Sequence, residues 1–444
     1  MAKDIFETAS IPQAVAKMVV PSIMSMLVLI LYNIADIFFV GKTGDANQVA
    51  AVSLTIPVFM LFIAVGNIFG IGGSSVISRS IGRGDKARAA RISSFCFYAS
   101  IVSGLIMIAL FLLGMGVISR IIGTNEKTVD FARSYLTYIA VGAPFIIIPA
   151  AFGHIVRGEG APKQAMIGMM IGTIINIILD PIMILAMDMG VAGAALATVI
   201  GNVVGSIYFI HYLVGKKTLL SIRLRDAKID RDDASGVFGI GIPASLNSVL
   251  MSTAFILLNN VLNGYADGEI YIAAMGVAKR AGIFLIFTQL GFAMGIQPLV
   301  GYCYGARNME RLKKIIRFSF ICTAVLGIIS TIVYALAADV IIKAFIADEA
   351  VVENGVKIMH ALIISYPVIG VLFVITFSFQ AMGMVGSSLL LNVSRQGLVF
   401  IPLLYIFNAT VGLGGVYYSQ AIADYVSVFI AITLFVLAMK KAAR

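Results

Sequence analysis

The sequence predicts an all-α integral membrane protein with 12 transmembrane helices in two six-helix lobes. Of its 444 residues, 60% are hydrophobic and only 12% are charged, whereas a soluble domain carries about 25% charged residues. The apolar residues fall in long runs, such as 101–117 and 321–338. Runs of about this length with few charges are typical of membrane-spanning helices. A third observation, an internal duplication, sets the division into lobes.

Residues of the first half recur in the second half at a nearly constant spacing. Pro21 matches Pro243 at 222 positions, and Gly72 matches Gly295 at 223. Further matches are Gly82 with Gly305, Pro144 with Pro367, Gly160 with Gly383 and Gly190 with Gly412. A period this long repeats a whole bundle rather than a solenoid unit. Two related bundles enclosing a central cleft are a common architecture of transporters.

The predicted helices follow the apolar runs in order. The N-lobe comprises residues 1–214, a cytoplasmic linker follows at 215–235, and the C-lobe comprises 236–444. The N-lobe spans are 12–40, 48–78, 92–117, 132–156, 164–187 and 191–214, and the C-lobe spans are 236–262, 271–304, 316–338, 356–381, 388–408 and 414–439. Because six is even, both lobes enter the membrane from the same side, so we expect a pseudo-twofold axis along the membrane normal.

The net charge of +10 predicts orientation rather than nucleic-acid binding. Basic residues cluster at 79–91, 216–231 and 307–317, each between apolar runs. Cytoplasmic loops carry such an excess of Lys and Arg. We therefore expect a multi-pass protein of the cell (inner or plasma) membrane with both termini in the cytoplasm, monomeric, and without a nucleic-acid partner.

Three of the 22 acidic residues lie well inside the predicted spans: Asp36, Asp180 and Asp424. A carboxylate at such depth costs several kcal/mol unless it is neutralised, paired or hydrated, so each is a functional candidate. Burial favours the neutral form, which suits a proton carrier.

Five polar residues of the N-lobe are expected at one depth. Counting 1.5 Å per residue, Asp36 lies about 8–12 Å below the outer surface, and Asp180 and Thr198 each lie roughly 11 Å below it. Asn176 is one turn from Asp180, and Tyr32 is one turn from Asp36. This group could share a proton or supply oxygen ligands to sodium. The alternative is that these side chains only hydrogen-bond the helices together.

Asp424 is the only deep acid of the C-lobe, and Gln420 precedes it by one turn. Arg395, Lys279 and Arg280 are its candidate partners within helices. One interpretation is a static ion pair that braces the lobe, and the other is an acid that contacts substrate or takes part in coupling.

The order of motifs resembles the multidrug and toxic compound extrusion (MATE) family over essentially the whole chain. The first two helices, "PSIMSMLVLILYNIADIFFVGKTG" and "AAVSLTIPVFMLFIAVGNIFGIGGSSVISRSIGRGD", carry the resemblance, with "HIVRGEGAPKQAM" and "GIQPLVGYCYGARN". Members export cationic, amphipathic compounds in exchange for protons or sodium ions. The resemblance therefore implies a V-shaped central cleft, alternating access and no cofactor besides the coupling ion.

The resemblance favours the DinF-like branch over the NorM-like branch. In DinF-like members a first-helix Asp, a fifth-helix Asn and Asp, and a sixth-helix Thr form a cation site, which maps onto Asp36, Asn176, Asp180 and Thr198. A backbone carbonyl at Ala194 is implied as a further ligand. NorM-like members carry acids in helices seven and ten, and here 236–262 and 356–381 have none.

A proline inside a helix removes a hydrogen bond and kinks the segment. In DinF-like members, bending at the first-helix proline is proposed to follow protonation, so Pro21, together with Tyr32, is the candidate conformational switch. A static kink at Pro21 is the alternative.

Several other function classes fit the sequence poorly. The chain lacks a Walker A motif, so ATP does not drive it. The Gly-x-Gly-Asp motif of intramembrane aspartyl proteases is missing, because Asp180 follows Ile-Ile-Leu, and we expect no enzyme activity. A channel fits the duplication with asymmetric acids less well than alternating access does. A lipid-linked oligosaccharide flippase of the same superfamily is the remaining alternative.

Overall fold

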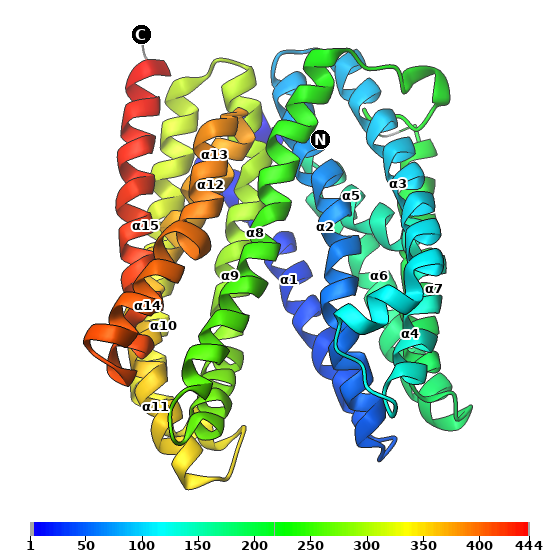
Figure 1. Cartoon of the computed structure of the whole chain (residues 1–444). Helices are drawn as coiled ribbons and strands as arrows, with labels where there is room; N and C mark the ends of the chain where they lie inside the picture. The colour runs from blue at the N-terminus through cyan, green and yellow to red at the C-terminus, as the bar shows by residue number, and fades with distance from the viewer. Residues whose placement is uncertain (1–3, 217, 443–444) are drawn as a thin grey trace. The chain divides into compact units, whose positions relative to one another are not determined.

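The computed structural model describes residues 4–216 and 218–442, apart from the side chains of Asp4, Asn33, Ile37 and Ala442, and the regular secondary structure of the described chain is entirely helical (Figure 1). The first half contains α1 (Ile11–Gly41), α2 (Ala46–Gly82), α3 (Lys86–Ile121), α4 (Val129–Val141), α5 (Ala143–Gly158), α6 (Pro162–Asp180) and α7 (Gly190–Val214), with short turns η1 (Asp4–Thr8), η2 (Pro181–Ala186) and η3 (Leu224–Asp226). The second half contains α8 (Arg231–Asn263), α9 (Gly268–Gly305), α10 (Met309–Lys343), α11 (Glu349–Ile363), α12 (Tyr366–Met382), α13 (Val385–Val393), η4 (Ser394–Phe400), α14 (Ile401–Thr410) and α15 (Leu413–Ala442).

Ten helical segments of the described chain are long and apolar enough to span a membrane, and the number is 12 when each of two bent pairs counts as one span. This confirms the predicted all-helical membrane fold. The bent pairs are α4 with α5, at 60°, and α11 with α12, at 50°. Pro144 and Pro367 stand at the starts of α5 and α12. Because proline cannot donate to the preceding turn, the duplicated proline accounts for a break at the same place in each half.

The helix α8 begins earlier than predicted, at Arg231 rather than 236. Its first turn is polar, so the apolar run marks only its later part. The Asp230 carboxylate accepts a hydrogen bond of 2.8 Å from the backbone N–H of Asp233, which satisfies one of the unpaired donors at a helix start. Asp232 and Asp233 add negative charge where the helix dipole favours it.

Packing divides the chain into two compact units. Unit 1 takes in the chain up to Glu7 and Met24–Ser245, and unit 2 takes in Thr8–Ile23 and the chain from Leu246 onward. The division therefore falls inside α1 and inside α8. In α1 it lies two residues after Pro21, and in α8 two residues after Pro243.

Close helix contacts attach the first part of α8 to unit 1 and the first part of α1 to unit 2. A Cβ on Gly72 of α2 would lie 2.0 Å from the carbonyl oxygen of Val237 in α8. A Cβ on Gly295 of α9 would lie 2.6 Å from Cα of Val19 in α1. Glycine permits such close backbone approach between membrane helices. The duplicated pair of glycines thus makes the equivalent contact in each unit.

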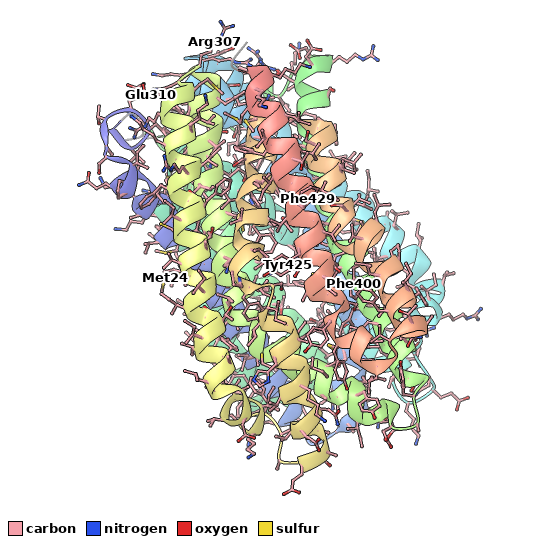
Figure 2. The ribbon with its side chains drawn as sticks, turned by 90° about the vertical axis from the view of Figure 1, so that its left-hand side faces the viewer. Met24, Arg307, Glu310, Phe400, Tyr425 and Phe429 are labelled. Carbon is pink, nitrogen blue, oxygen red and sulfur yellow. The ribbon has the colours of Figure 1, made fainter. Side chains whose placement is uncertain are left out.

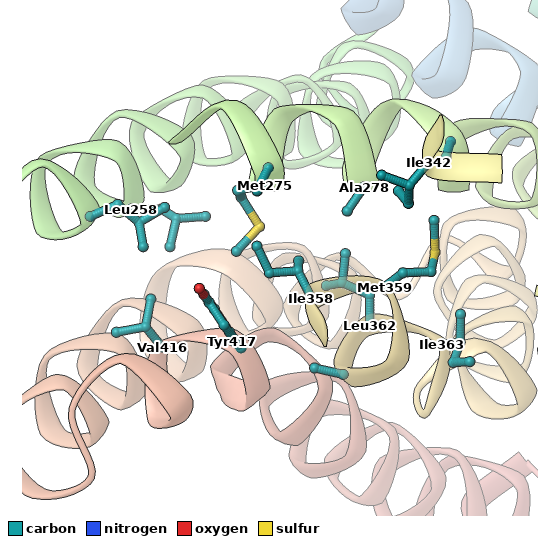
Figure 3. Packing of buried hydrophobic residues seen from close by; sticks show 14 of the residues in the cluster. Leu258, Met275, Ala278, Ile342, Ile358, Met359, Leu362, Ile363, Val416 and Tyr417 are labelled. Atoms are coloured by element: carbon teal, nitrogen blue, oxygen red, sulfur yellow. The ribbon is translucent and has the colours of Figure 1, made fainter. Parts of the chain in front are cut away.

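Each unit has its own apolar core. In unit 1, Phe62, Phe111, Ile139 and Val191 pack in one buried cluster between α2, α3, α4 and α7. In unit 2, α8, α9, α11 and α15 converge on a cluster that includes Leu258, Met275, Ile358 and Tyr417 (Figure 3).

Charged residues of unit 2 gather at a helix end, and large apolar residues cover the sides. Figure 2 shows Arg307 and Glu310 at the connection between α9 and α10, whereas Phe429 lies along α15. The side chain of Phe429 is 73% exposed. An exposed aromatic on a helix side suits contact with lipid.

The linker between α7 and α8 is fixed by Glu159, which follows α5. The Glu159 carboxylate is buried and accepts hydrogen bonds from the Tyr212 hydroxyl at 2.5 Å, the Thr218 hydroxyl at 2.8 Å and the backbone N–H of Leu219 at 3.0 Å. Burial raises the pKa of the Glu159 carboxyl above its ordinary value, and these hydrogen bonds offset part of that effect.

We expect Gly72→Ala to destabilise the protein, because its methyl group must displace the backbone of α8. Overpacking of this kind typically costs about 1–3 kcal/mol. The matched control is Gly116→Ala on α3, where a Cβ meets no atom within 4 Å. Thermal unfolding in detergent measures both variants. Equal midpoints for Gly72→Ala and the control would contradict the close-contact interpretation.

The raised pKa of Glu159 predicts a pH dependence of stability. The folded protein binds more protons than the unfolded chain between the ordinary value of 4.5 and the raised folded value. The free energy of unfolding therefore falls as pH rises through that window. Thermal unfolding across this window should show a smaller decline for Glu159→Gln than for the wild type. Parallel curves for the two proteins would count against this explanation.

Candidate cation-coupling site

Asn176 and Asp180 occupy the last turn of α6, and both side chains are buried. They are four residues apart and therefore lie on one face. Pro181 follows directly and begins the π-helical turn η2. Because proline has no N–H, the regular α-helical bonding cannot continue through it. Such π turns in helices often occur at functional sites.

Hydrogen bonds connect these residues to α7 and α1. The Asn176 amide donates to Oδ1 of Asp180 at 3.3 Å and to Oγ1 of Thr198 at 3.3 Å. The Tyr32 hydroxyl lies 3.4 Å from the same Thr198 oxygen. Side chains from three helices thus form one polar cluster within unit 1.

Asp36 lies one turn beyond Tyr32 on α1 and is 8% exposed. Its charge is close enough to that of Asp180 for the two to interact. The predicted residues Asp36, Asn176, Asp180, Thr198 and Tyr32 therefore meet within one unit.

Three oxygen atoms of this cluster are buried without a hydrogen-bond partner in the described part of the chain. They are Oδ1 of Asp36, Oδ2 of Asp180 and Oδ1 of Asn176. Buried polar atoms are normally paired. The two carboxylate oxygens can accept a proton, and all three oxygens can coordinate a cation, since oxygen is the ligand that hard cations prefer.

Tyr135 of α4 belongs to the same neighbourhood, although it is not among the residues predicted from the sequence. It is 5% exposed, and its phenol is close enough to Asp36 and Asp180 to interact with their charges. Counting from Val129, Tyr135 lies about 9 Å inside the start of α4. This similar depth is the signal that could have identified it.

The roles proposed for Ala194 and Pro21 stay predictions. Ala194 is fully buried in α7, one turn before Thr198. Pro21 lies inside the continuous helix α1. Among the described residues, no group of three or more His, Cys, Asp or Glu could hold a metal ion. A sodium site here would therefore depend on the amide and hydroxyl oxygens as well as on the two acids.

A second polar cluster lies in unit 2. The buried Asp424 of α15 accepts hydrogen bonds from Nε of Arg395 at 2.8 Å and from the Gln420 amide at 3.0 Å, both at Oδ1. Arg395 projects from the π-helical turn η4, and its guanidinium stacks over Phe373 at 5.3 Å. The structure thus pairs Asp424 with Arg395 and Gln420.

The other two candidate partners of Asp424 differ in position. Lys279 of α9 is close enough to interact with the charges of Arg395 and Asp424, and its ammonium lies 5.1 Å from the centre of the Phe255 ring. Arg280 has an exposed side chain.

We expect Asp424→Asn to destabilise the protein by about 3–5 kcal/mol, because it leaves the Arg395 charge largely buried and unpaired. Thermal unfolding should show partial recovery in the double variant Asp424→Asn with Arg395→Gln. The control is Asp339→Asn, which removes an exposed pair with Lys343 and should cost about 0–1 kcal/mol. Equal costs for the buried and the exposed pair would contradict the role of burial.

Comparison with known proteins places the chain in a family. A family model described as MatE matches residues 21–182 and 243–406, so the two matched segments begin at the duplicated Pro21 and Pro243. The multidrug export protein MepA of Staphylococcus aureus (strain N315) is 33% identical over 419 residues, which cover 94% of this chain and 92% of MepA. MepA of Staphylococcus saprophyticus is 32% identical over the same coverage.

A solved structure gives the same result for the fold. The structure described as an outward-facing conformation of a multidrug resistance MATE family transporter of the MOP superfamily superposes with a TM-score of 0.93 at 28% identity. The match covers 100% of this chain and 98% of that one. Both halves of the sequence, the relatives and the fold therefore agree: the chain belongs to the MatE family of multi-pass membrane transporters, which are not enzymes.

Proposed function

We propose that this protein is a secondary active multidrug exporter that exchanges cationic, amphipathic compounds for protons or sodium ions by alternating access. Membership of the MatE family and the likeness to the multidrug export protein MepA support the transport part. The observation that carries the coupling part is the cluster of buried, unpartnered oxygens on Asp36, Asp180 and Asn176.

The coupling ion is bound by the two carboxylates. Asp36 and Asp180 supply negative charge, and Asn176 and Thr198 supply neutral oxygens. Tyr32 connects the cluster to α1 through Thr198. Two carboxylates in an apolar interior repel each other and cost free energy when both are ionised. An entering cation lowers that cost, whether it is a proton shared between them or a sodium ion held by the surrounding oxygens.

Transport follows if the ion and the substrate favour different conformations. A ligand shifts a conformational equilibrium only by its difference in affinity for the two states, and coupling between two ligands is reciprocal. Ion binding from outside then favours release of the drug, and drug binding from the cytoplasm or inner leaflet favours the ion-free state. Ion release toward the cytoplasm completes the exchange.

The first helix is the element that responds to the ion. Asp36 and Tyr32 lie in the part of α1 that belongs to unit 1, whereas Thr8–Ile23 belongs to unit 2. The change of unit follows Pro21, where a backbone hydrogen bond is missing. Neutralisation of Asp36 therefore acts on a helix that already lacks a backbone hydrogen bond at Pro21, in its first half, which supports Pro21 as the conformational switch.

The branch of the family, the orientation and the lobes are part of this proposal. The site residues and the absence of acids from 236–262 and 356–381 favour the DinF-like branch. The basic loops favour cytoplasmic termini, with the chain in the cell membrane as a monomer and the two halves as separate lobes.

We expect Asp36→Asn to fold normally and to lose coupled efflux by at least about tenfold, the scale of a typical coupling free energy. Ethidium export from proteoliposomes under separate proton and sodium gradients measures the loss and identifies the ion. The matched control is Asp45→Asn at the start of α2, where asparagine also caps the helix. Proton-driven or sodium-driven export by Asp36→Asn at the wild-type rate would refute the coupling assignment.

A further inference from the structure

A pocket of about 720 Å³ lies between α2, α3, the linker and the first part of α8, and all of its lining residues belong to unit 1. Its walls are mostly apolar. The Phe238 ring meets the Phe69 ring with centroids 6.0 Å apart and the Phe95 ring with centroids 6.2 Å apart, both edge-on. Ala99 and Val102 continue the wall along α3. The proposed coupling mechanism does not use this pocket.

The pocket reaches about as deep as one leaflet of a membrane. The apolar run of α3 begins at Ile92, and Val102 lies ten residues further on, which is about 15 Å at 1.5 Å per residue. This is half of a hydrocarbon core about 30 Å thick. Val102 lines the pocket and is 53% exposed, so the pocket opens on the side of α3 that suits contact with lipid. An acyl chain therefore fits its direction and its depth.

Two contacts fix the linker and the start of α8 against α3. The Tyr98 hydroxyl, which lines the pocket, donates to the carbonyl oxygen of Ile222 at 3.0 Å. Nε of Arg88 donates to Oδ1 of the buried Asp233 at 2.6 Å. The pocket is therefore formed before any ligand binds, which lowers the conformational cost of binding.

Asp230 and Arg231 line the end of the pocket that the linker forms, and both are exposed. Oδ1 of Asp230 accepts a hydrogen bond from the backbone N–H of Asp233 at 2.8 Å, which leaves the other carboxylate oxygen available to a donor. The Arg231 guanidinium can donate to phosphate, for which its geometry is suited. Together the two side chains match a headgroup that carries both a phosphate and an ammonium.

The charge around this end of the pocket is mixed rather than basic. The segment 227–234 carries two basic and three acidic residues, and one of the acids, Asp233, is already paired with Arg88. Anionic lipids are recognised by clusters of about 4–8 Lys or Arg. A balance of both signs favours a zwitterionic headgroup instead.

We propose that this pocket binds one phospholipid whose headgroup bears a primary ammonium, as in phosphatidylethanolamine. Its acyl chain lies along α3 between Phe95 and Val102, its phosphate contacts Arg231, and its ammonium donates to Asp230. Phosphatidylcholine lacks the N–H donors for the last contact, and phosphatidylglycerol lacks the cation. The inference depends only on contacts within unit 1 and goes beyond the proposed export function.

The test uses tryptophan fluorescence, because the chain contains no tryptophan. Val102→Trp places a single reporter in the pocket. The matched control is Val325→Trp on α10: each valine lies 16 residues after the start of its helix, and Val325 is 49% exposed. The full-length protein in lipid nanodiscs is titrated with phospholipids brominated in their acyl chains, which quench tryptophan on contact.

We expect phosphatidylethanolamine to bind at Val102→Trp about fivefold more strongly than phosphatidylcholine or phosphatidylglycerol, the scale of one exposed charge pair. At Val325→Trp the three lipids should quench equally. Equal quenching by the three lipids at Val102→Trp would overturn the proposal, because it would mean contact with bulk lipid only. Preference for phosphatidylglycerol there would also overturn it.

A matched pair of variants in the Val102→Trp background tests the headgroup contact. Asp230→Asn should abolish the preference for phosphatidylethanolamine, although asparagine can still cap α8. Asp232→Asn removes an acid from the first turn of the same helix but does not line the pocket, so it should retain the preference. Equal behaviour of the two variants would refute the role of Asp230. The measurement needs neither drug nor ion gradient, so its failure leaves the export proposal unaffected.

Discussion

The interaction on which this structure depends is the neutralisation of charge inside an apolar membrane. A carboxylate or an amine placed there costs several kcal/mol unless something compensates it. Asp424 is compensated by Arg395, and Glu159 at a helix end is compensated by three hydrogen bonds. Asp36 and Asp180 have no cationic partner in the described chain. In the proposed function their charge is compensated by the coupling ion, in contrast to buried charges that are permanently paired.

The duplication gives the two halves the same backbone features, but their charged residues differ. Glycine contacts at Gly72 and Gly295 and the bends before Pro144 and Pro367 occur in both halves. The charged residues do not follow this symmetry. At the spacing of the repeat, Asp36 corresponds to Leu258, which packs in the apolar core of unit 2. Backbone constraints such as close approach and missing donors act equally on both copies, so they persist, whereas a site needs its acids only once.

The sequence was sufficient to predict those features that depend on one helix at a time. Apolar runs predicted the spans, and the spacing of Asn176 and Asp180 predicted a shared face. Features that depend on contacts between several helices were harder to predict from the sequence. Tyr135 enters the site from α4, and tyrosine is common in membrane helices, so nothing in its own segment distinguishes it. The early start of α8 was missed because hydropathy does not register a polar first turn.

The partner of Asp424 also could not be predicted from the sequence. The sequence placed Lys279, Arg280 and Arg395 within predicted spans as candidate partners of one acid, Asp424. Only the structure shows that Arg395 contacts it. Which cation remains without a carboxylate depends on side-chain directions across α9, η4 and α15, and hydrophobic periodicity does not encode these.

The hydrogen-bond donors and acceptors of the unit 1 cluster do not match, which is unexpected if these side chains only hydrogen-bond the helices together. The Asn176 amide uses its N–H donors on Asp180 and Thr198. Oδ1 of Asp36, Oδ2 of Asp180 and Oδ1 of Asn176 are then left as acceptors without donors in the described chain. Polar residues that only join helices would be expected to satisfy one another, because an unpaired buried acceptor costs about 1–3 kcal/mol. Surplus acceptors and two acidic groups suit a positive occupant, and this argument supports the proposed binding of the coupling ion at the cluster.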